Sequence, residues 1–296
     1  MNSFAMKIIY EQNALPPSEK IIKISTLGEN YNFKNYYVET TKKQYFLKIN
    51  EKINNQCIVI NKMYKDTRFN TLTKRDVYYS DEKIILMEYF HSKRFSNDFL
   101  NSRIIAEKIA HFHTEKRTHY GYKYDTYIGS LLQSNQQLKS WKEFFLNQRY
   151  DCLWSAIKKS MQIGSKLDNK ILSVRDYINR NLKEPESPTL IHGDIWSGNI
   201  LMNGNSSTQI KIIDPALFCA DSEFELAYIY LNGTFGRSFY ESYAYHRQIT
   251  DEFWQFKLFI YQLIPLMQYT LLEGSLYLKE IEKILDFLIK RDNLKY

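Results

Sequence analysis

The segment Leu190-Ile-His-Gly-Asp-Ile-Trp-Ser-Gly-Asn199 joins a short apolar run to a polar loop. Leu190 and Ile191 are typical of a buried strand, and the loop after them carries a carboxylate at Asp194 and an amide at Asn199. An isolated His-Gly-Asp triplet is more often an ordinary turn, in which the aspartate caps a loop. The residues that follow the segment decide between a turn and a chemical site.

A hairpin is predicted directly after this loop. Two apolar runs, Ile200-Leu-Met202 and Ile210-Lys-Ile-Ile213, flank a polar segment at 203–208 that suits a turn. A chain that folds back in this way would return Asp214 to the side of the loop that carries Asp194. The sequence therefore predicts that two carboxylates and an amide meet in one place.

These three side chains fit the chemistry of phosphoryl transfer. That reaction needs a carboxylate that orients the attacking hydroxyl and accepts its proton, and hard oxygen ligands for the magnesium ions that bridge the phosphates. Asp194 fits the first role, while Asn199 and Asp214 fit the second. In its logic the spacing matches the catalytic loop and the metal-binding aspartate of protein kinases. We therefore predict a phosphotransferase that uses ATP and Mg²⁺.

Residues 1–90 are predicted to form a β-rich lobe that binds the nucleotide. Short β-branched and aromatic runs are separated by polar turns, and a helix is expected over residues 52–65, where apolar residues recur at intervals of three to four. After residue 90 the pattern becomes helical, apart from a β-rich insert at 189–214. This order predicts an α+β, two-lobed protein-kinase-like fold, with residues 91–296 as the larger, mainly helical catalytic and substrate-binding lobe.

Several features of the β-rich lobe suit ATP. Lys48 ends a strand-like run, where a kinase places the lysine that contacts the phosphates; a solvated strand-end lysine is the alternative. The run Leu86-Met-Glu-Tyr-Phe90 ends at the lobe boundary and is either an adenine-binding edge or an ordinary core strand. The predicted adenine contacts are the backbone groups of Glu88, Tyr89 and Phe90.

The composition predicts a folded, cytoplasmic protein. Of the 296 residues, 44% are hydrophobic and 25% are charged, which suits a globular chain with a sizeable core. The net charge of +7 is spread along the chain without a run of five or six basic residues, so neither nucleic acid nor a membrane is an expected partner. The three cysteines form no CxxC pair, which fits a reducing cytosol, and residues 1–7 show no secretory signal. The apolar segment 256–272 is interrupted by polar residues and predicts a buried helix.

Motifs outside the loop are shared with a known family. The matching segments are His192-Gly-Asp-Ile-Trp-Ser-Gly-Asn199, Ile213-Asp-Pro-Ala216, Tyr127-Ile-Gly-Ser130 with Gln133 and Asn135, Phe144-Phe145, Gln148-Arg149, Ser222-Glu-Phe-Glu-Leu-Ala227 and Tyr261-Gln-Leu263. Over roughly residues 110–285, the chain resembles the fructosamine (ketosamine) kinase family, within the aminoglycoside and choline kinase-like superfamily. Trp196 and the Ile-Gly-Ser stretch point to fructosamine kinases rather than to antibiotic kinases.

The resemblance implies transfer of the ATP γ-phosphate to a sugar hydroxyl of a fructosamine or related ketoamine. By likeness, Asp194 is the catalytic base, and Asn199 and Asp214 are the magnesium ligands. Lys48 contacts the phosphates of ATP. The ketoamine acceptor is either a small molecule or a protein-bound group.

Other residues gain roles from the same resemblance. Trp196 would line the sugar site, because the C–H face of a sugar packs well on an indole, or it would anchor the loop in the core. Arg149 would meet an anionic group or hold the catalytic loop through a buried ion pair. Glu223 and Glu225 lie where related kinases keep an acidic residue that braces the catalytic loop.

The β-rich lobe departs from the family pattern at two points. The resemblance implies that the turn Leu27-Gly-Glu-Asn-Tyr-Asn-Phe33 covers the phosphates, with Gly28 as a nucleotide contact. This turn has one glycine and no cysteine, where family members carry a glycine-rich turn, often with a cysteine. Residues 52–65 lack the glutamate that normally pairs with the phosphate lysine, and Gln56 is the nearest polar candidate. Two alternatives to a ketoamine kinase therefore stay open. One is a kinase of another small hydroxyl compound, such as an aminoglycoside, an amino sugar or choline. The other is a catalytically weak, pseudokinase-like nucleotide-binding protein. The phosphorylated hydroxyl and the oligomeric state are left open.

Overall fold

The computed structural model describes residues 3–52, 54–93, 95, 98–204, 206 and 209–293, apart from the side chain of Phe99. The chain divides into two compact units, Met1–Phe95 with Ile200–Pro215, and Ser96–Asn199 with Ala216–Tyr296. The sequence suggests a single boundary near residue 90. The structure differs from that division because the hairpin that follows the His-Gly-Asp loop belongs to the first unit. The nucleotide-binding and catalytic roles of the two parts stay predictions.

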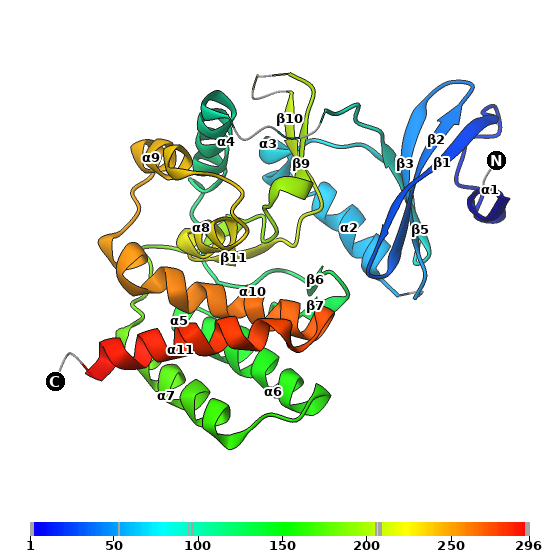
Figure 1. The fold of residues 1–296 in the computed structure, drawn as a ribbon. Coiled ribbons are helices and arrows are strands. Elements are labelled where there is room, and N and C mark those ends of the chain that lie inside the picture. Colours follow the sequence, from blue (N-terminus) through cyan, green and yellow to red (C-terminus); the bar gives the residue numbers. More distant parts are fainter. Residues whose placement is uncertain are drawn as a thin grey trace. The chain divides into compact units, whose positions relative to one another are not determined.

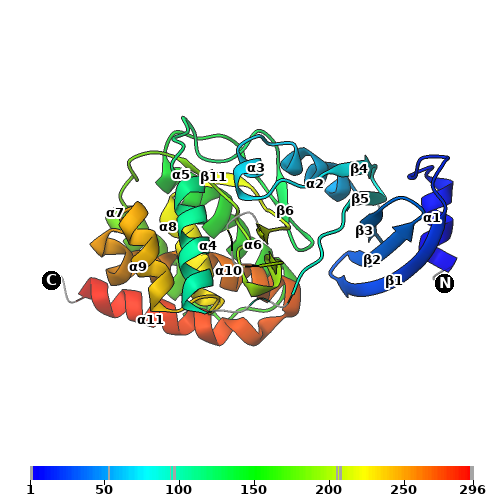
Figure 2. The ribbon, with the colours of Figure 1, turned by 90° about the horizontal axis from the view of Figure 1, so that it is seen from above.

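The first unit is built on an antiparallel sheet with the strand order β1-β2-β3-β5-β4 (Figure 1). Its strands are β1 (Ile21–Asn30), β2 (Phe33–Thr40), β3 (Gln44–Asn50), β4 (Val77–Ser80) and β5 (Ile84–Glu88). Tyr36 and Val38 of β2 lie on the same buried face as Leu47 of β3, because alternate residues of a strand point to the same side. Helix α1 (Ser3–Glu11) packs on this face through Ile8 and Ile9 (Figure 2).

Two helices and a hairpin complete the first unit. They are α2 (Gln56–Tyr64), α3 (Phe69–Leu72) and the pair β9 (Ile200–Met202) and β10 (Ile210–Ile212). The hairpin is joined to the unit by a bond from Lys93 N to Met202 O of 2.7 Å, and by one from Ile212 N to the hydroxyl of Thr73, also of 2.7 Å. The strands and the helix expected in this part are present, whereas α1 was not predicted. Ile53 of the expected helix, and residues 205, 207 and 208 of the expected turn, lie outside the described residues.

The second unit is mainly helical, as the sequence predicts. Its helices are α4 (Phe99–Phe112), α5 (Trp141–Phe145), α6 (Asp151–Ser160), α7 (Ser165–Asn181), α8 (Ser222–Leu231), α9 (Arg237–His246), α10 (Leu258–Glu273) and α11 (Leu278–Asn293). Short turns are the π-helical η1 (Leu146–Tyr150) and η3 (Phe253–Lys257), and the 3-10 turns η2 (Ser197–Asn199) and η4 (Ser275–Tyr277). The antiparallel pairs are β6 (Thr126–Ile128) with β7 (Leu131–Gln133), and β8 (Thr189–Ile191) with β11 (Phe218–Ala220).

Helix α10 is the central helix of this unit. It packs against α6, α8 and α11, and its residues from Leu258 to Thr270 are buried on nearly every side, with Pro265 among them (Figure 1). A helix that is apolar and buried all round belongs to a protein core. The buried helix predicted over residues 256–272 is therefore confirmed. Within the described ranges, no helix is both long and apolar enough to cross a membrane.

Candidate active site

The His-Gly-Asp loop begins where β8 ends. This strand pairs with β11, so that Ile191 lies opposite Phe218. Gly193 has a φ of +83°, and a Cβ at this position would lie 2.5 Å from the carbonyl oxygen of Ala216. Glycine alone meets both conditions without strain. A backbone bond of 2.8 Å from Ala216 N to His192 O closes the turn that presents the next residue, Asp194.

Glu225 of α8 holds the backbone of this loop. Its carboxylate accepts hydrogen bonds from the N–H groups of His192 at 3.1 Å and Gly193 at 2.6 Å, and Nε2 of His113 lies 2.9 Å away. Burial would raise the pKa of Glu225, but the hydrogen bond and the charge of His113 hold it below its ordinary value. Glu225 is therefore an ionised brace for the loop, in the role expected for an acid at this position.

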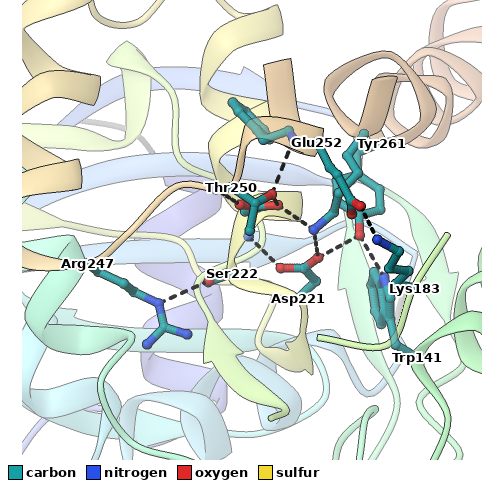
Figure 3. A network of polar contacts seen from close by, with 11 residues as sticks. Trp141, Lys183, Asp221, Ser222, Arg247, Thr250, Glu252 and Tyr261 are labelled. Carbon is teal, nitrogen blue, oxygen red and sulfur yellow. Dashed lines mark hydrogen bonds and ion pairs between the residues drawn. The ribbon is translucent and has the colours of Figure 1, made fainter. Parts of the chain in front are cut away.

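Helix α8 is itself fixed at its first turn by a buried polar cluster (Figure 3). Asp221 caps the helix by accepting the N–H of Glu223 at 3.0 Å. Nζ of Lys257 lies 2.6 Å from Asp221 and also contacts Glu223, and the hydroxyl of Tyr261 donates to Asp221 at 2.7 Å. Burial and the nearby charge of Asp221 raise the pKa of Glu223. The two carboxylates thus share Lys257, which fixes the start of the helix that braces the loop.

The side chain of Asp194 is held at both of its oxygens. Asn199, at the end of the 3-10 turn η2, donates from Nδ2 to Oδ2 of Asp194 and to its backbone oxygen, in each case at 2.9 Å. Tyr228 of α8 donates its hydroxyl to Oδ1 at 2.5 Å. The sequence prediction did not include Tyr228. The available signal was its spacing, because a residue three positions after Glu225 faces the same side of a helix.

Trp196 lies in the same loop and is 42% exposed, which argues against its alternative role as a core anchor. A Cβ added to Gly198 would lie 2.3 Å from Cη2 of the indole, so the ring lies across this glycine. An exposed aromatic face two residues after Asp194 suits the C–H face of a sugar ring. The placement of Trp196 therefore supports its predicted role in the sugar site.

The first unit contains the predicted phosphate lysine and the second metal-binding residue. Lys48 of β3 is buried, and its Nζ lies 2.7 Å from Oδ2 of Asp214, which follows the hairpin β9–β10. Asp214 has a φ of +56°, a left-handed conformation that few aspartates adopt, and its N–H donates to the hydroxyl of Tyr64 at 3.2 Å. The hairpin therefore brings Asp214 to Lys48 within one compact unit.

Helix α2 supplies no carboxylate to Lys48, in agreement with the sequence, since its residues Gln56–Tyr64 include no acid. Gln56 is buried and accepts a hydrogen bond from Nδ2 of Asn32 at 3.1 Å, which ties the β1–β2 turn to the helix. Asp214 takes the place of the missing glutamate as the ion-pair partner of Lys48.

The turn between β1 and β2 presents a side chain where the family has glycines. Gly28 has a φ of +141°, and no atom lies within 4 Å of a Cβ built on it, so backbone conformation rather than space favours glycine there. Tyr31, at the tip, also has a positive φ of +47° and is 52% exposed. A tyrosine at this point limits how closely backbone amides approach a phosphate.

At the strand end predicted to contact adenine, some backbone groups already form hydrogen bonds with other residues of the protein. The N–H of Glu88 donates to the carbonyl of Asp76 at 2.8 Å, and Nε of Arg75 donates to the carbonyl of Glu88 at 3.0 Å. The guanidinium of Arg75 lies 5.1 Å from the ring of Phe90. The N–H of Glu88 already donates within the protein and cannot also donate to a ligand. We therefore expect the N–H of Tyr89 or Phe90 to donate to adenine instead.

Arg149 is buried, which does not support the predicted substrate contact. Its side chain is 2% exposed, Nη1 donates to the carbonyl of Ser134 at 2.6 Å, and Nη2 donates to Oδ1 of Asn135 at 2.7 Å. The guanidinium carbon lies 4.7 Å from the ring centre of Phe144 and 4.4 Å from that of Phe218. Burial lowers the pKa of Arg149 to about 9. Within the described residues, Arg149 therefore braces the interior through hydrogen bonds and ring contacts, and the expected ion pair that would hold the catalytic loop is not present.

Solved structures show which fold this chain has. An aminoglycoside phosphotransferase, in a ternary complex with AMP-PNP and hygromycin B, matches with a TM-score of 0.66 over 98% of each chain at 13% identity. The predicted two-lobed, protein-kinase-like fold is thereby confirmed. The family model described as fructosamine kinase matches residues 18–291. The chain belongs to the fructosamine kinase family.

Individual relatives agree with this assignment. A probable ketoamine kinase of Enterococcus faecium is 24% identical over 275 residues, which cover 89% of this chain and 94% of the relative. One of Klebsiella aerogenes is 29% identical over 208 residues, which cover 70% of this chain and 69% of that one. A solved structure from Thermobifida fusca, assigned as a fructosamine-3-kinase, matches with a TM-score of 0.81 at 20% identity over 98% of this chain and 99% of that one. The predicted class, an ATP-dependent small-molecule kinase of the ketoamine type, is confirmed.

Proposed function

We propose that this chain transfers the γ-phosphate of ATP to a sugar hydroxyl of a fructosamine or related ketoamine, with Asp194 as the catalytic base. The observation that carries the proposal is the carboxylate of Asp194, which Asn199 and Tyr228 orient at its two oxygens in a loop that also exposes Trp196. A carboxylate held in this way suits the orientation of an attacking hydroxyl. Membership of the family supports the class of acceptor.

Each residue of the loop has a distinct part in this reaction. Asp194 accepts a hydrogen bond from the acceptor hydroxyl and takes its proton as the new P–O bond forms, while the bond from the γ-phosphorus to the bridging oxygen breaks and ADP leaves. Trp196 packs on the sugar ring and sets the direction from which the hydroxyl approaches. In the first unit, Lys48 donates to the phosphate oxygens, and the backbone of Tyr89 and Phe90 contacts the adenine.

Asn199 and Asp214 would hold Mg²⁺ in this reaction. Their amide and carboxylate oxygens are hard ligands of the kind that magnesium prefers, and magnesium usually takes only one or two protein carboxylates, with water and phosphate oxygens at its other positions. Among the described residues, no group of three or more His, Cys, Asp or Glu forms a competing metal cage. The donor set therefore fits the ion, which neutralises charge on the transferred phosphoryl group when it is bound.

The substitution Asp194→Asn tests the proposal, because it keeps the size of the side chain and removes the base. We expect the wild-type protein to form ADP with fructosamines in the presence of magnesium. The variant should lose about 10²-fold or more in kcat, since a general base contributes at least that much. Binding of an ATP analogue should be unchanged, because Lys48 and the adenine contacts lie on other elements.

A panel of acceptors completes this experiment. Equal turnover by the wild type and by Asp194→Asn would refute the role of Asp194. A preference for aminoglycosides or choline over fructosamines would overturn the acceptor class. Binding of ATP without turnover on any acceptor would identify a pseudokinase.

A further inference from the structure

We propose that Tyr228 is a positioning residue for Asp194: its hydroxyl fixes one carboxylate oxygen so that the acceptor hydroxyl meets the carboxylate in a single orientation. The inference rests on the proposed role of Asp194 as the base. It assigns a part in the reaction to a residue of α8, outside the His-Gly-Asp loop and the other residues predicted for the site.

The geometry at Asp194 removes the freedom of its carboxylate to rotate. Tyr228 donates to Oδ1 at 2.5 Å and Asn199 donates to Oδ2 at 2.9 Å, and the two donors belong to separate elements, α8 and η2. A terminal carboxylate otherwise has a broad range of rotation about its last bond. Each carboxylate oxygen has two acceptor sites, so these bonds leave room for a bond from a substrate hydroxyl. Asp194 itself is partly exposed, which lets an acceptor approach.

Tyr228 is rigid enough to serve this purpose. Its side chain is 5% exposed, and it lies on the helix whose first turn is fixed by the cluster around Asp221 and Lys257 (Figure 3). Three positions before it, Glu225 binds the backbone of the loop. One helix thus holds both the backbone of the His-Gly-Asp loop and the carboxylate that the loop carries. Movement of either part would break bonds to the other.

The phenol of Tyr228 acts as a donor and does not release its proton. Burial and the charge of Asp194 raise its pKa well above the ordinary value of 10. A second hydroxyl, that of Tyr269, lies 3.2 Å from the hydroxyl of Tyr228 and 3.0 Å from Oδ1 of Asn232. The hydroxyl of Tyr269 therefore gives the Tyr228 oxygen a second polar contact besides Asp194.

The substitution Tyr228→Phe removes the hydroxyl and keeps the buried ring. We expect kcat to fall about tenfold, equivalent to about 1.4 kcal/mol in the activation free energy. The KM values for ATP and for the fructosamine acceptor should stay within about twofold, because the loop backbone and Trp196 keep their supports. A merely structural role would instead lower the temperature of thermal unfolding, or change both KM values.

Tyr230→Phe is the matched control. Tyr230 lies on the same helix, but its side chain is 48% exposed and packs against Tyr240 and Trp254. Loss of its hydroxyl should leave kcat and both KM values at the wild-type level. A tenfold loss in Tyr230→Phe as well would show that α8 is simply sensitive to substitution, and would overturn the inference.

Asp194→Asn and a protein with a tyrosine analogue at position 228 distinguish failure of the role of Tyr228 from failure of the proposed function. A folded Tyr228→Phe protein with wild-type kcat, beside an inactive Asp194→Asn protein, would overturn the role of Tyr228 and leave the proposed function intact. Full activity in both variants would remove the proposed function itself. Site-specific 3,5-difluorotyrosine at position 228 keeps the ring and the hydroxyl but makes the phenol a stronger donor. A stronger bond to Asp194 weakens that carboxylate as a base, so kcat should fall about threefold below the wild type. If Tyr228→Phe does not fold, this analogue alone decides, because a kcat identical to the wild type despite a stronger phenol donor would refute the inference.

Discussion

The two sets of residues proposed for the reaction, one in each compact unit, are supported in different ways. In the second unit, the hydroxyl of Tyr228 fixes one oxygen of Asp194 and the carboxylate of Glu225 fixes its loop, and neither group has to touch ATP or the acceptor. Asn199, which bonds to the other oxygen of Asp194, is also a proposed magnesium ligand. In the first unit, Lys48 is fixed by Asp214, and both of these residues are proposed to bind ligands. A support made of non-binding groups survives ligand binding unchanged. A support made of ligand-binding groups has to rearrange.

The absence of an acid from α2 explains this difference. Gln56, the nearest polar candidate, bonds to Asn32 and thereby supports the β1–β2 turn. Lys48 consequently pairs with the carboxylate of Asp214, which is also the predicted magnesium ligand. The catalytic loop is therefore expected to be preorganised, whereas the phosphate-binding residues are expected to take their final arrangement only with ATP and magnesium bound. Substitutions in the two sets should then affect different kinetic constants.

The substitution Lys48→Met breaks the phosphate-binding set alone and should give the largest effect. It removes a donor to the phosphates and leaves Asp214 without its ion-pair partner. We expect kcat/KM for ATP to fall about 10²-fold, or about 2.7 kcal/mol, mainly through a higher KM for ATP. The KM for the acceptor should stay within about twofold. Steady-state kinetics with each substrate varied in turn measures both constants.

Lys43→Met is the control for this substitution. Lys43 lies in the same unit directly before β3, but it is exposed and its ammonium group lies over the ring of Tyr78. Its replacement should change neither constant. A wild-type KM for ATP in Lys48→Met would show that Asp214 alone organises the phosphates, and that the comparison between the two supports is wrong.

Local patterns in the sequence predicted much of the fold and of the candidate site. The spacing of Asp194, Asn199 and Asp214 predicted residues that the structure places in one loop and at the end of one hairpin. Short β-branched and aromatic runs between polar turns predicted the strands of the first unit. These features depend on neighbours a few positions away, which a sequence shows directly. The strand that carries Lys48 was predicted from the same kind of pattern, but β3 continues beyond Lys48 to Asn50, so the lysine does not end the strand.

Features that depend on distant residues could not be predicted in this way. Arg149 is buried because Phe218, far along the chain, closes over its guanidinium. The hairpin after Asn199 joins the first unit through bonds to Thr73 and Lys93. Tyr228 had a usable spacing from Glu225, but its meaning depends on knowing that α8 lies beside the catalytic loop.

Trp196→Ala tests the acceptor-binding residues of the second unit and should have a smaller effect than Lys48→Met. Loss of the exposed indole removes the surface proposed to pack on the sugar, so the KM for the fructosamine should rise about tenfold, equivalent to about 1.4 kcal/mol. The KM for ATP should not change. Trp254→Ala is a matched control, because this tryptophan of the same unit is exposed to a similar extent, 44% against 42%. An unchanged acceptor KM in Trp196→Ala would remove Trp196 from the sugar site.

The pH dependence of stability tests the support of the catalytic loop and should give the smallest effect. The pKa of Glu225 is held below its ordinary value of 4.5, so its contribution to folding is present above that pH and is lost as the pH falls from there toward its value in the folded protein. The free energy of unfolding, measured by urea denaturation between pH 6 and pH 3, should therefore decrease on the acid side. One such group adds at most about 1.4 kcal/mol per pH unit to the slope.

Glu225→Gln should be less stable at neutral pH and should have a shallower acid slope. Glu241→Gln, which alters an exposed carboxylate, should keep the wild-type slope. An identical slope in Glu225→Gln would show that the loop does not depend on an ionised brace, and would remove the main difference between the two supports.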